Sequence, residues 1–426
     1  MGLKIIIPKE TQPGEHRVAA SVETVKKLCA LGCIVMLEKD AGLKAAIPDS
    51  AYIEAGGIIA KGHKDLYTSA DIVLKVQAPN KDEMALIPKG ALLIALLSPH
   101  SNSDLPAKFA KAGINAFAME LVPRISRAQS MDALSSQSNL SGYKAVLDAT
   151  EYYPHAFPMM MTAAGTIPPA KVFVMGAGVA GLQAIATARR LGAVVTATDV
   201  RPAAKEQVAS LGANFIAVED EEFKQAETAG GYAKEMSESY KKKQAELVEA
   251  HIAKQDIVIT TALIPGRPAP KLISEDMVKS MKTGSVIVDL AVETGGNCEI
   301  SICGEVIEKH GVTIVGHQNT PSRLAADSSA LYAKNLLNLL KLIIDEEDIK
   351  LAINWDDEII KGVAISKDGA VIHPLFQNVK ASAQKKTSST KATTKKTTTK
   401  KSSTTKTKKA TATKSKSTSK KTKKDS

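Results

Sequence analysis

One stretch, residues 171–199, constrains the fold of this chain more than any other. An apolar run leads into Gly176, Gly178 and Gly181, which have the spacing G-x-G-x-x-G. A helical pattern follows, and a second β-rich run ends at Asp199, 18 positions after Gly181. In such a unit the first glycine permits a tight turn, the second lets the backbone approach a pyrophosphate, and the third lets the helix pack on the sheet. The order predicts a dinucleotide site, with phosphates at the helix N-terminus and ribose hydroxyls on Asp199.

Short apolar runs alternate with helical patterns, which is typical of a doubly wound α/β fold with parallel sheets. We expect a first set of strands at residues 4–7, 33–37, 72–76, 92–97 and 115–118. We expect a second set at residues 172–175, 194–198, 214–217, 257–261, 286–290 and 313–315. Long helical patterns at 138–153 and 322–344 flank the second set. The sequence thus predicts two Rossmann-like domains with an interdomain cleft, the nucleotide domain (136–321) being inserted into a first domain (1–135 and 322–378).

A polar, highly charged segment at about residues 219–249 interrupts the strand pattern. A stretch of ~30 residues without a strand is uncommon in a compact domain unless it has a role of its own. One interpretation is a surface excursion whose C-terminal part, 241–252, is helical. Because Gly230 and Gly231 stand beside Tyr232, we favour the other interpretation, a mobile loop that covers the cleft.

Charge is distributed very unevenly along the 426 residues. The net charge is +11, but residues 380–426 contain 17 lysines and one aspartate, a net of +16, so the rest of the chain carries −5. The Lys/Thr/Ser-rich segment 379–426 cannot bury enough apolar surface to fold, and we expect it to be disordered. It contains no aromatic residue to stack on bases, which makes nucleic acid an unlikely partner.

Neither the cysteines nor the apolar runs indicate a metal site or a membrane span. Cys29, Cys33, Cys298 and Cys303 form no C-x-x-C pair and no zinc-type spacing with histidine, as is typical of reduced thiols in the cytoplasm. Apolar runs such as 91–97 are far shorter than the ~20 residues that span a bilayer. We expect no metal and no membrane-crossing helix.

Several longer motifs accompany the glycine turn. They are Ile7-Pro8-Lys9-Glu10 with Glu15-His16-Arg17-Val18-Ala19, the loop Pro123–Gln137 (PRISRAQSMDALSSQ), Asp199-Val200-Arg201, Gly230–Met236 (GGYAKEM) and Asp289–Cys298 (DLAVETGGNC). Together they resemble the NAD(H)-binding component, domain I, of the proton-translocating nicotinamide nucleotide transhydrogenases. The resemblance covers about residues 3–377.

The resemblance implies a role for individual residues. In the loop of residues 123–137, called the signature loop below, the residues implied to hold the nicotinamide and its ribose are Arg124, Gln129, Ser130, Met131, Asp132 and Ser135, with Gln129 nearest the hydride exchange. The other implied cofactor contacts are Gly176, Gly178, Val179 and Gly181 at the pyrophosphate, Asp199, Val200 and Arg201 at the adenosine ribose, Gly231 and Tyr232 in a mobile loop, and Ala262 and Leu263 in the cleft wall.

The chemistry of these residues agrees with such a role. Hydride transfer between two nicotinamide rings releases no proton, so the site needs groups that orient the rings rather than an acid or a base. Arg124, Gln129, Asp132 and Ser135 can orient rings, although Ser, Asp and Gln also suit an ordinary helix cap. The carboxylate of Asp199 repels a 2′-phosphate and so favours NAD(H) over NADP(H). Arg201 could accept a 2′-phosphate, so these residues alone leave the choice of cofactor partly open.

The alanine dehydrogenases offer a rival interpretation, because they share the N-terminal motif. Arg17 and Lys75 match the residues that bind the oxo acid in that family. Amine oxidation also requires proton transfer by a histidine and an aspartate. This chain has Ser98 and Glu293 at those positions, and His100 lies two residues from Ser98. We therefore expect Arg17 and Lys75 to form structural ion pairs.

A second rival is a non-enzymatic NAD-binding scaffold whose basic tail binds nucleic acid. The net charge of −5 outside the tail argues against an extended basic face. Our prediction is therefore an NAD(H)-binding transhydrogenase subunit. The resemblance implies a membrane-spanning subunit and an NADP(H)-binding component as partners, a homodimer, and a peripheral location at the cytoplasmic face of the inner membrane. We further expect the tail to contact anionic lipid weakly.

Overall fold

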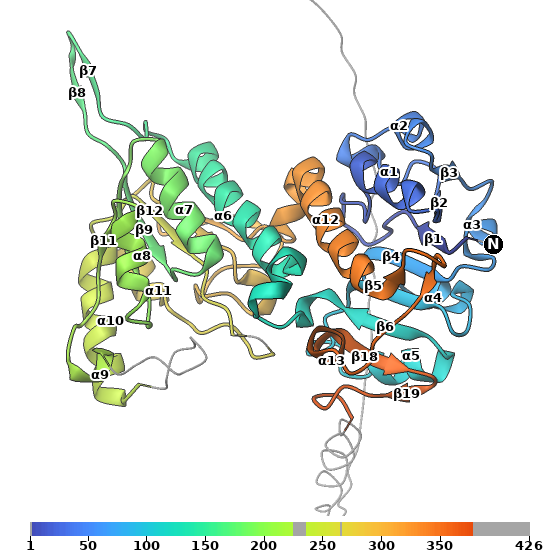
Figure 1. Ribbon diagram of the computed structural model, residues 1–426. Coiled ribbons are helices and arrows are strands. Elements are labelled where there is room, and N and C mark those ends of the chain that lie inside the picture. The colour runs from blue at the N-terminus through green and yellow to red at the C-terminus, as the bar shows by residue number, and fades with distance from the viewer. Residues whose placement is uncertain (1, 225–235, 265, 378–426) are drawn as a thin grey trace, which may run out of the picture. The chain divides into compact units, whose positions relative to one another are not determined.

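The computed structural model describes residues 2–224, 236–264 and 266–377. Two large sheets, each flanked by helices, make up most of this part of the chain (Figure 1). The fold is therefore α/β with two Rossmann-like sheets, as the sequence predicts.

The first sheet has eight strands in the order β19-β18-β6-β5-β4-β1-β2-β3. Their bounds are β1 Lys4–Ile7, β2 Ile34–Leu37, β3 Ile58–Ile59, β4 Ile72–Gln77, β5 Leu92–Leu96, β6 Asn115–Ala118, β18 Ala364–Lys367 and β19 Ala370–Val371. Strands β1 to β6 pair in parallel, whereas β18 pairs antiparallel with both β6 and β19. The sheet is thus mixed rather than wholly parallel, because the chain returns to its edge as a hairpin near the C-terminal end of the described residues.

Helices cover this sheet. They are α1 Val22–Ala30, α2 Asp49–Glu54, α3 His63–Tyr67, α4 Lys81–Leu86, α5 Leu105–Ala112, α12 Ala325–Ile343 and α13 Glu358–Val363, with the 3₁₀ turns η1 Leu43–Ala45, η2 Met119–Leu121 and η3 Ser126–Met131. A small hairpin, β16 Ile344–Asp345 and β17 Lys350–Leu351, follows α12.

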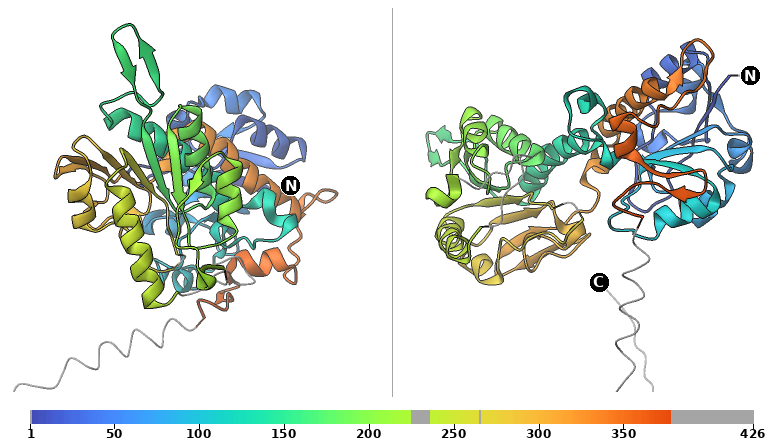
Figure 2. Two further views of the ribbon diagram at one scale, coloured as in Figure 1. Left: turned by 90° about the vertical axis from the view of Figure 1, so that its left-hand side faces the viewer. Right: turned by 60° about the horizontal axis from the view of Figure 1, so that its bottom comes forward.

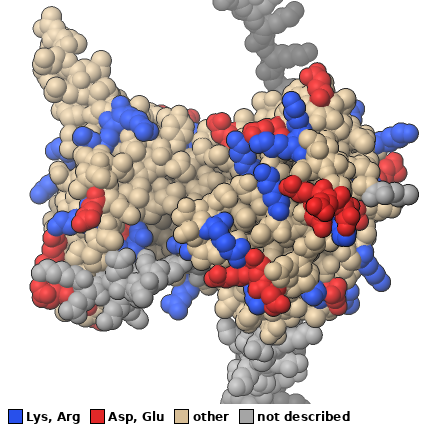
Figure 3. Space-filling model, in the orientation of Figure 1, with Lys and Arg blue, Asp and Glu red and all other residues tan. Residues whose placement is uncertain are grey.

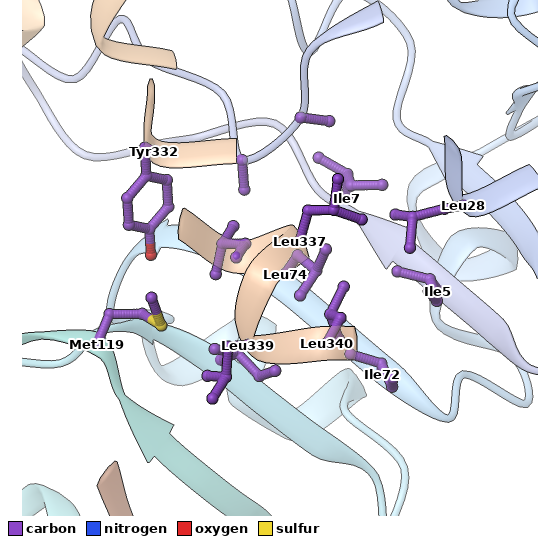
Figure 4. Close-up of a cluster of buried hydrophobic side chains, with 14 of the residues drawn as sticks. Ile5, Ile7, Leu28, Ile72, Leu74, Met119, Tyr332, Leu337, Leu339 and Leu340 are labelled. Atoms are coloured by element: carbon purple, nitrogen blue, oxygen red, sulfur yellow. The ribbon is translucent and has the colours of Figure 1, made fainter. Parts of the chain in front are cut away.

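Helix α12 buries its apolar stripe against the first sheet. Leu337, Leu339 and Leu340 share one hydrophobic cluster with Ile5 and Leu74 of the strands (Figure 4). Tyr332, also fully buried, donates a hydrogen bond from its hydroxyl to the carbonyl of Lys75 at 2.9 Å. The residues that follow the second sheet thus complete the core of the first.

The second sheet has seven strands in the order β11-β10-β9-β12-β13-β15-β14. The strands are β9 Lys171–Met175, β10 Val194–Thr198, β11 Asn214–Phe215, β12 Ile257–Thr260, β13 Val286–Asp289, β14 Val306–Lys309 and β15 Val312–Val315. All pairs are parallel except β14 with β15, a hairpin at the edge. Its helices are α6 Ala133–Tyr152, α7 Val179–Arg190, α8 Ala204–Ser210, α9 Glu221–Lys224, α10 Glu238–Ile252 and α11 Glu275–Ser280, with the turns η4 Val292–Thr294 and η5 Thr320–Leu324.

Helix α6 connects the two sheets. It contacts α12 and η5, and its residues Ala145, Val146 and Ala149 join the core of the second sheet. It crosses α7 closely, because a Cβ built on Gly142 would lie 2.0 Å from the carbonyl oxygen of Ala180. The helix expected at 138–153 is α6, which begins earlier, at Ala133. The helix expected at 322–344 is α12, which begins at Ala325, after the turn η5.

One feature was not predicted from the sequence, and one predicted segment is described only in part. A hairpin, β7 Met160–Thr162 with β8 Gly165–Ile167, projects beyond the sheet that contains β9 (Figure 1, Figure 2). In the range 219–249, expected as a mobile loop, α9 and α10 occupy much of the described portion, in agreement with the helix expected at 241–252. Residues 225–235 between them, with Gly230, Gly231 and Tyr232, lie outside the described residues, as does the tail 378–426.

Candidate functional site

The glycine turn joins β9 to α7 as its spacing predicts. Gly176 has a φ of +104°, in the left-handed region that favours glycine. A Cβ on Gly181 would lie 1.8 Å from the carbonyl oxygen of Gly176, so only glycine allows the helix to pack this closely. A Cβ on Gly178, in contrast, would meet nothing within 4 Å. Gly176 and Gly181 therefore serve the fold, whereas the space at Gly178 is open to a ligand.

Helix α7 begins without a side-chain cap. Its N-cap residue is Gly178, which has no side chain to accept a hydrogen bond from the first turn. The N–H groups at the start of a helix attract anions, above all phosphate. The turn thus fits the pyrophosphate of a dinucleotide in both space and charge.

This turn lies at the topological switch point of the second sheet, between β9 and β12. The chain proceeds from β9 to β10 on one side and later returns to β12 on the other. Thr261, which follows β12, donates a hydrogen bond from its hydroxyl to the Gly176 carbonyl at 3.0 Å. In open α/β sheets ligands bind in the crevice at this point, beyond the carboxyl ends of the strands. We call it the second switch point.

Asp199 lies at the end of the neighbouring strand, β10. One carboxylate oxygen, Oδ2, accepts a hydrogen bond from the Ala177 N–H in the glycine turn at 2.7 Å. The other, Oδ1, accepts from the backbone N–H of Arg201 at 2.9 Å, and the Arg201 guanidinium bonds to both oxygens at 2.9 and 3.0 Å. The acid that favours a free ribose and the arginine that could accept a 2′-phosphate are therefore in direct contact.

Exposed apolar side chains surround the second switch point. Val179 is 41% exposed, Val200 47% and Leu263 55%, and they follow β9, β10 and β12 respectively. These strands are neighbours in the sheet, so the three side chains lie beyond the same edge of it, where the strands have their carboxyl ends. Apolar side chains on a site with few polar groups are typical of cofactor pockets.

Two residues that received no role from the sequence hold this edge together. The buried carboxylate of Asp289 accepts hydrogen bonds from Thr260, Ser301 and three backbone N–H groups. One of these is the N–H of Asn297, whose side chain accepts from the Ala262 N–H at 3.0 Å and donates to the Ala262 carbonyl at 2.9 Å. Both residues belong to the motif at 289–298. The sequence pattern that could have revealed their role is an aspartate at the end of an apolar strand, followed by Gly-Gly-Asn.

The signature loop has a buried inner side and an exposed outer side. Ala128 and Met131 are buried in the first hydrophobic cluster, so Met131 packs in the core. The side chains of Arg124, Gln129 and Ser130 lie on the exposed side.

Asp132 and Ser135 form the helix cap at the end of the loop. Asp132 is the N-cap of α6, and its carboxylate accepts from the Ser135 N–H at 2.8 Å and from the Ser135 hydroxyl at 2.5 Å. The six predicted loop residues thus lie in one continuous segment that runs from just before η3 through its end to the first turn of α6. The structure also gives two of them the capping role that the sequence left open.

Five charged residues fill the corresponding point of the first sheet, between β1 and β4, which we call the first switch point. They are Glu10, Glu15, Arg17, Lys75 and Glu83, and all are buried. Lys75 Nζ lies 3.1 Å from Glu83 and 3.3 Å from Glu10. The Arg17 guanidinium donates twice to Glu15, at 2.8 and 2.6 Å. As expected, Arg17 and Lys75 form ion pairs within the protein.

The pKa values of two of these carboxyls are shifted in opposite directions. Burial alone raises the pKa of Glu15, but hydrogen bonds from Arg17, Gln77 and Asn319 outweigh it and hold that pKa at about 2. At Glu10 burial prevails over the attraction of Lys75, and the pKa is raised. The cluster thus combines a carboxylate that stays ionised with one that retains its proton more readily.

The positions that carry proton transfer in alanine dehydrogenases contain no histidine here. Ser98 is exposed, has a φ of +48°, and donates its backbone N–H to the carboxylate of half-buried Glu120. Glu293 is exposed on η4. His100 packs its ring against Phe376, with 5.1 Å between centroids.

Two family models cover nearly all of the described chain. The alanine dehydrogenase/PNT N-terminal domain matches residues 6–141, and the corresponding C-terminal domain matches residues 145–374. In Rhodospirillum rubrum, the first part of the NAD(P) transhydrogenase subunit alpha is 58% identical over 377 residues, which are 87% of this chain and 98% of the relative. The NAD(P) transhydrogenase subunit alpha of Haemophilus influenzae is 46% identical over 90% of this chain and 74% of the relative.

Solved structures give the same result. The crystal structure of transhydrogenase from Sinorhizobium meliloti superposes with a TM-score of 0.79 at 56% identity, covering 87% of this chain and all of that one. An L-alanine dehydrogenase superposes with a TM-score of 0.75 at 25% identity, covering 89% of this chain and 99% of that one. The chain belongs to the alanine dehydrogenase/PNT family, and within it to the transhydrogenase alpha subunits. An oxidoreductase role follows from this membership, with the alanine dehydrogenases as distant relatives.

Proposed function

We propose that this chain binds NAD(H) at the second switch point and exchanges hydride directly with NADP(H) held by a separate component of a proton-translocating transhydrogenase. The observation that carries the proposal is the connection of the signature loop to the glycine turn by one helix. Helix α6 is capped by Asp132 and crosses α7 at Gly142, ten residues after the cap. At 1.5 Å per residue, these points are about 15 Å apart along the helix axis. An extended dinucleotide can reach across this separation.

In this proposal each group of residues holds a different portion of the nucleotide. Gly178 and the N-terminus of α7 hold the pyrophosphate, with Val179 beside it. Asp199, Val200 and Arg201 hold the adenosine ribose, and Ala262 and Leu263 form the opposite wall. Gly231 and Tyr232, outside the described residues, are assigned by the resemblance alone.

The signature loop orients the nicotinamide end. Arg124, Gln129, Ser130, Met131, Asp132 and Ser135 are assigned to it, with Gln129 nearest the acceptor. A bound nicotinamide supplies the hydride, and one C–H bond breaks as another forms with no proton released, so the exposed polar groups of the loop need only align the rings.

The position of the loop residues also suits an acceptor on another protein. Gln129 is exposed rather than enclosed by the described residues of this chain. No described helix is both long and apolar enough to cross a membrane. From the likeness to transhydrogenase alpha subunits we infer that a membrane-spanning subunit and an NADP(H)-binding component act with this chain, at the cytoplasmic face of the membrane.

The hairpin β7–β8 supports the proposal of a homodimer. Met159, Met160, Met161 and Ile167 are exposed there, Met161 at 77%. Residues 158–168 contain no charged side chain, and the hairpin carries no blue or red atoms in Figure 3. Exposed apolar patches of this kind mark interaction surfaces. Sedimentation of wild type and of Met161→Lys measures the oligomeric state and tests whether the hairpin forms a dimer interface. A variant that stays dimeric would contradict this role of the hairpin.

Two further proposals concern the arrangement of the chain and its tail. We assign residues 136–321 to the NAD(H) domain and residues 1–135 with 322–378 to the other.

The lysine-rich tail is proposed to hold the subunit near anionic lipid, each lysine near the surface contributing roughly 1 kcal/mol. Unchanged co-sedimentation with anionic vesicles after deletion of residues 380–426 would refute the lipid contact.

The experiment that tests the main proposal is hydride exchange. The purified chain is mixed with NADH, NADP⁺, an NAD analogue and an NADP(H)-binding transhydrogenase component, and a parallel assay contains L-alanine and NAD⁺. We expect reduction of the analogue only with the added component, and no reduction of NAD⁺ by L-alanine. Alanine oxidation without a partner would overturn the proposal. Exchange that survives truncation after Gln377 would exclude a scaffold that acts through its tail.

A further inference from the structure

The signature loop is held from outside at two points, and both holding groups come from the C-terminal region of the described chain. The first point is the backbone carbonyl of Ser130. Asn335 donates to it from its side-chain amide at 2.9 Å, and Asn338, one turn further along α12, donates at 3.0 Å. The oxygen of the Asn335 side chain accepts from the Ser136 hydroxyl at 2.7 Å. Asn335 therefore links the loop to the first turn of α6.

The second point is the side chain of Arg127. Its guanidinium forms a two-pronged ion pair with Asp357, at 2.9 and 2.8 Å. Asp357 is the N-cap of α13 and also accepts from the Ile359 N–H at 2.8 Å. Two parallel N–H···O bonds fix direction as well as distance. This side of the loop is thus fixed to a capped helix start.

These contacts bracket Gln129. On one side Arg127 is paired and Ala128 is buried, and on the other the Ser130 carbonyl is held and Met131 is buried. The side chain of Gln129 remains exposed. The backbone is therefore fixed on both sides of Gln129, the residue assigned nearest to the hydride exchange.

The two asparagines are not explained by helix formation or by burial. Asparagine is a poorer helix former than alanine, by several tenths of a kcal/mol, and both lie inside α12. The residue Ser130 is exposed, yet two side-chain amides donate to its single backbone carbonyl. What two donors add is a defined direction for the peptide that follows Gln129.

We propose that Asn335, Asn338 and Asp357 are positioning residues that align Gln129 for hydride exchange. We call these three residues the clamp. The inference rests on the proposed function. A loop built of 3₁₀ turns has poor hydrogen-bond geometry of its own. Misplacement of a reacting group by about 1 Å can cost on the order of 10²-fold in rate. The clamp prevents such displacement while leaving the nucleotide-binding groups of the second sheet untouched.

The test uses the full chain with the NADP(H)-binding component and compares Asn335→Asp with Asn115→Asp. Asn115 is a matched control, because its amide donates to the Gly90 carbonyl at 3.0 Å and its oxygen accepts from Asp368 at 2.9 Å, away from the loop. Asn335→Asp retains the acceptor for Ser136 but removes the donor to Ser130. Asn338→Asp, at a half-buried position, is a second variant whose folding is less at risk.

We expect the exchange rate at saturating nucleotide to fall about 10-fold or more in Asn335→Asp and about 3-fold in Asn338→Asp. The dissociation constant of NADH, measured by fluorescence titration, should change less than about 3-fold. The emission of Trp355, the single tryptophan, reports native packing two residues before Asp357. Asp357→Glu should restore some of the rate that Asp357→Asn loses, because it can still pair with Arg127.

The outcomes separate this inference from the function on which it rests. A wild-type chain that neither binds NADH nor exchanges hydride would overturn the proposed function, whatever the variants do. An active wild type with an equally fast, folded Asn335→Asp would overturn the clamp alone. A rate loss matched by Asn115→Asp would also overturn it, because the effect would not depend on the loop.

Discussion

The two switch points have the same topology and opposite contents. In the first sheet the order β3-β2-β1-β4-β5 places the carboxyl ends of β1 and β4 side by side, and β11-β10-β9-β12-β13 does the same for β9 and β12. At the first point, buried carboxylates and cations pair with one another. At the second, glycines leave the backbone open and the start of α7 has no side-chain cap from the described residues. Topology thus supplies a crevice twice, and the side chains at the strand ends decide which one receives a ligand.

The largest expected effect comes from breaking the first switch point. Lys75→Met removes the cation between Glu10 and Glu83 and leaves buried carboxylates unpaired, so we expect a loss of about 3–5 kcal/mol in the free energy of unfolding. Lys27→Met is the control, because its pair with Glu23 is half exposed and should contribute under ~1 kcal/mol. Denaturant unfolding measures both. Equal losses in the two variants would show that the buried pairs are not special.

A slightly smaller effect should appear in the pH dependence of stability. The pKa of Glu15 is lowered to about 2 in the folded chain, so its ionised form contributes stability at neutral pH that is lost as pH falls from about 4.5 to 2. The contribution is on the order of 3 kcal/mol. Glu10 acts in the opposite sense, since its raised pKa contributes stability at low pH that is lost as pH rises. In Glu15→Gln the acid limb should flatten; an unchanged limb would contradict the assignment.

Substitution within the glycine turn sharpens the contrast at the second switch point. Gly181→Ala places a Cβ 1.8 Å from the Gly176 carbonyl and should destabilise the chain by about 1–3 kcal/mol. Gly178→Ala meets no atom within 4 Å, so it should fold normally and weaken NADH binding instead, by about 10-fold. Thermal unfolding and fluorescence titration separate the two effects. Normal NADH binding by Gly178→Ala would place the pyrophosphate elsewhere.

The sequence was sufficient for the second switch point because its signals are local. Gly176, Gly178, Gly181 and Asp199 lie within 24 residues, and their spacing alone defines the turn. The first switch point has no such signal, since Arg17 meets Gln137 and Asn319 only after the chain has folded. We expected ion pairs for Arg17 and Lys75 because the alanine dehydrogenase histidine and aspartate are replaced by Ser98 and Glu293. The carboxylates that pair with Lys75, Glu10 and Glu83, came from the structure.

The same limit applies to the signature loop. Its residues stand out as a motif, and the capping role of Asp132 and Ser135 is readable from their spacing. Asn335 and Asp357, which hold the loop, are separated from it by some 200 residues or more and resemble ordinary helix residues. The hairpin β7–β8 was missed for another reason, because its short strands are exposed on both faces and show no alternation of apolar and polar residues.

The central claim is that chemistry belongs to the signature loop and not to the buried charges of the first sheet. The most direct measurement is the rate of hydride transfer from bound NADH to NADP⁺ on the partner component in Gln129→Asn. Shortening the side chain by one methylene should lower this rate about 10-fold or more, with NADH affinity changed less than about 3-fold. A rate equal to that of wild type, with both nucleotides bound, would contradict the account.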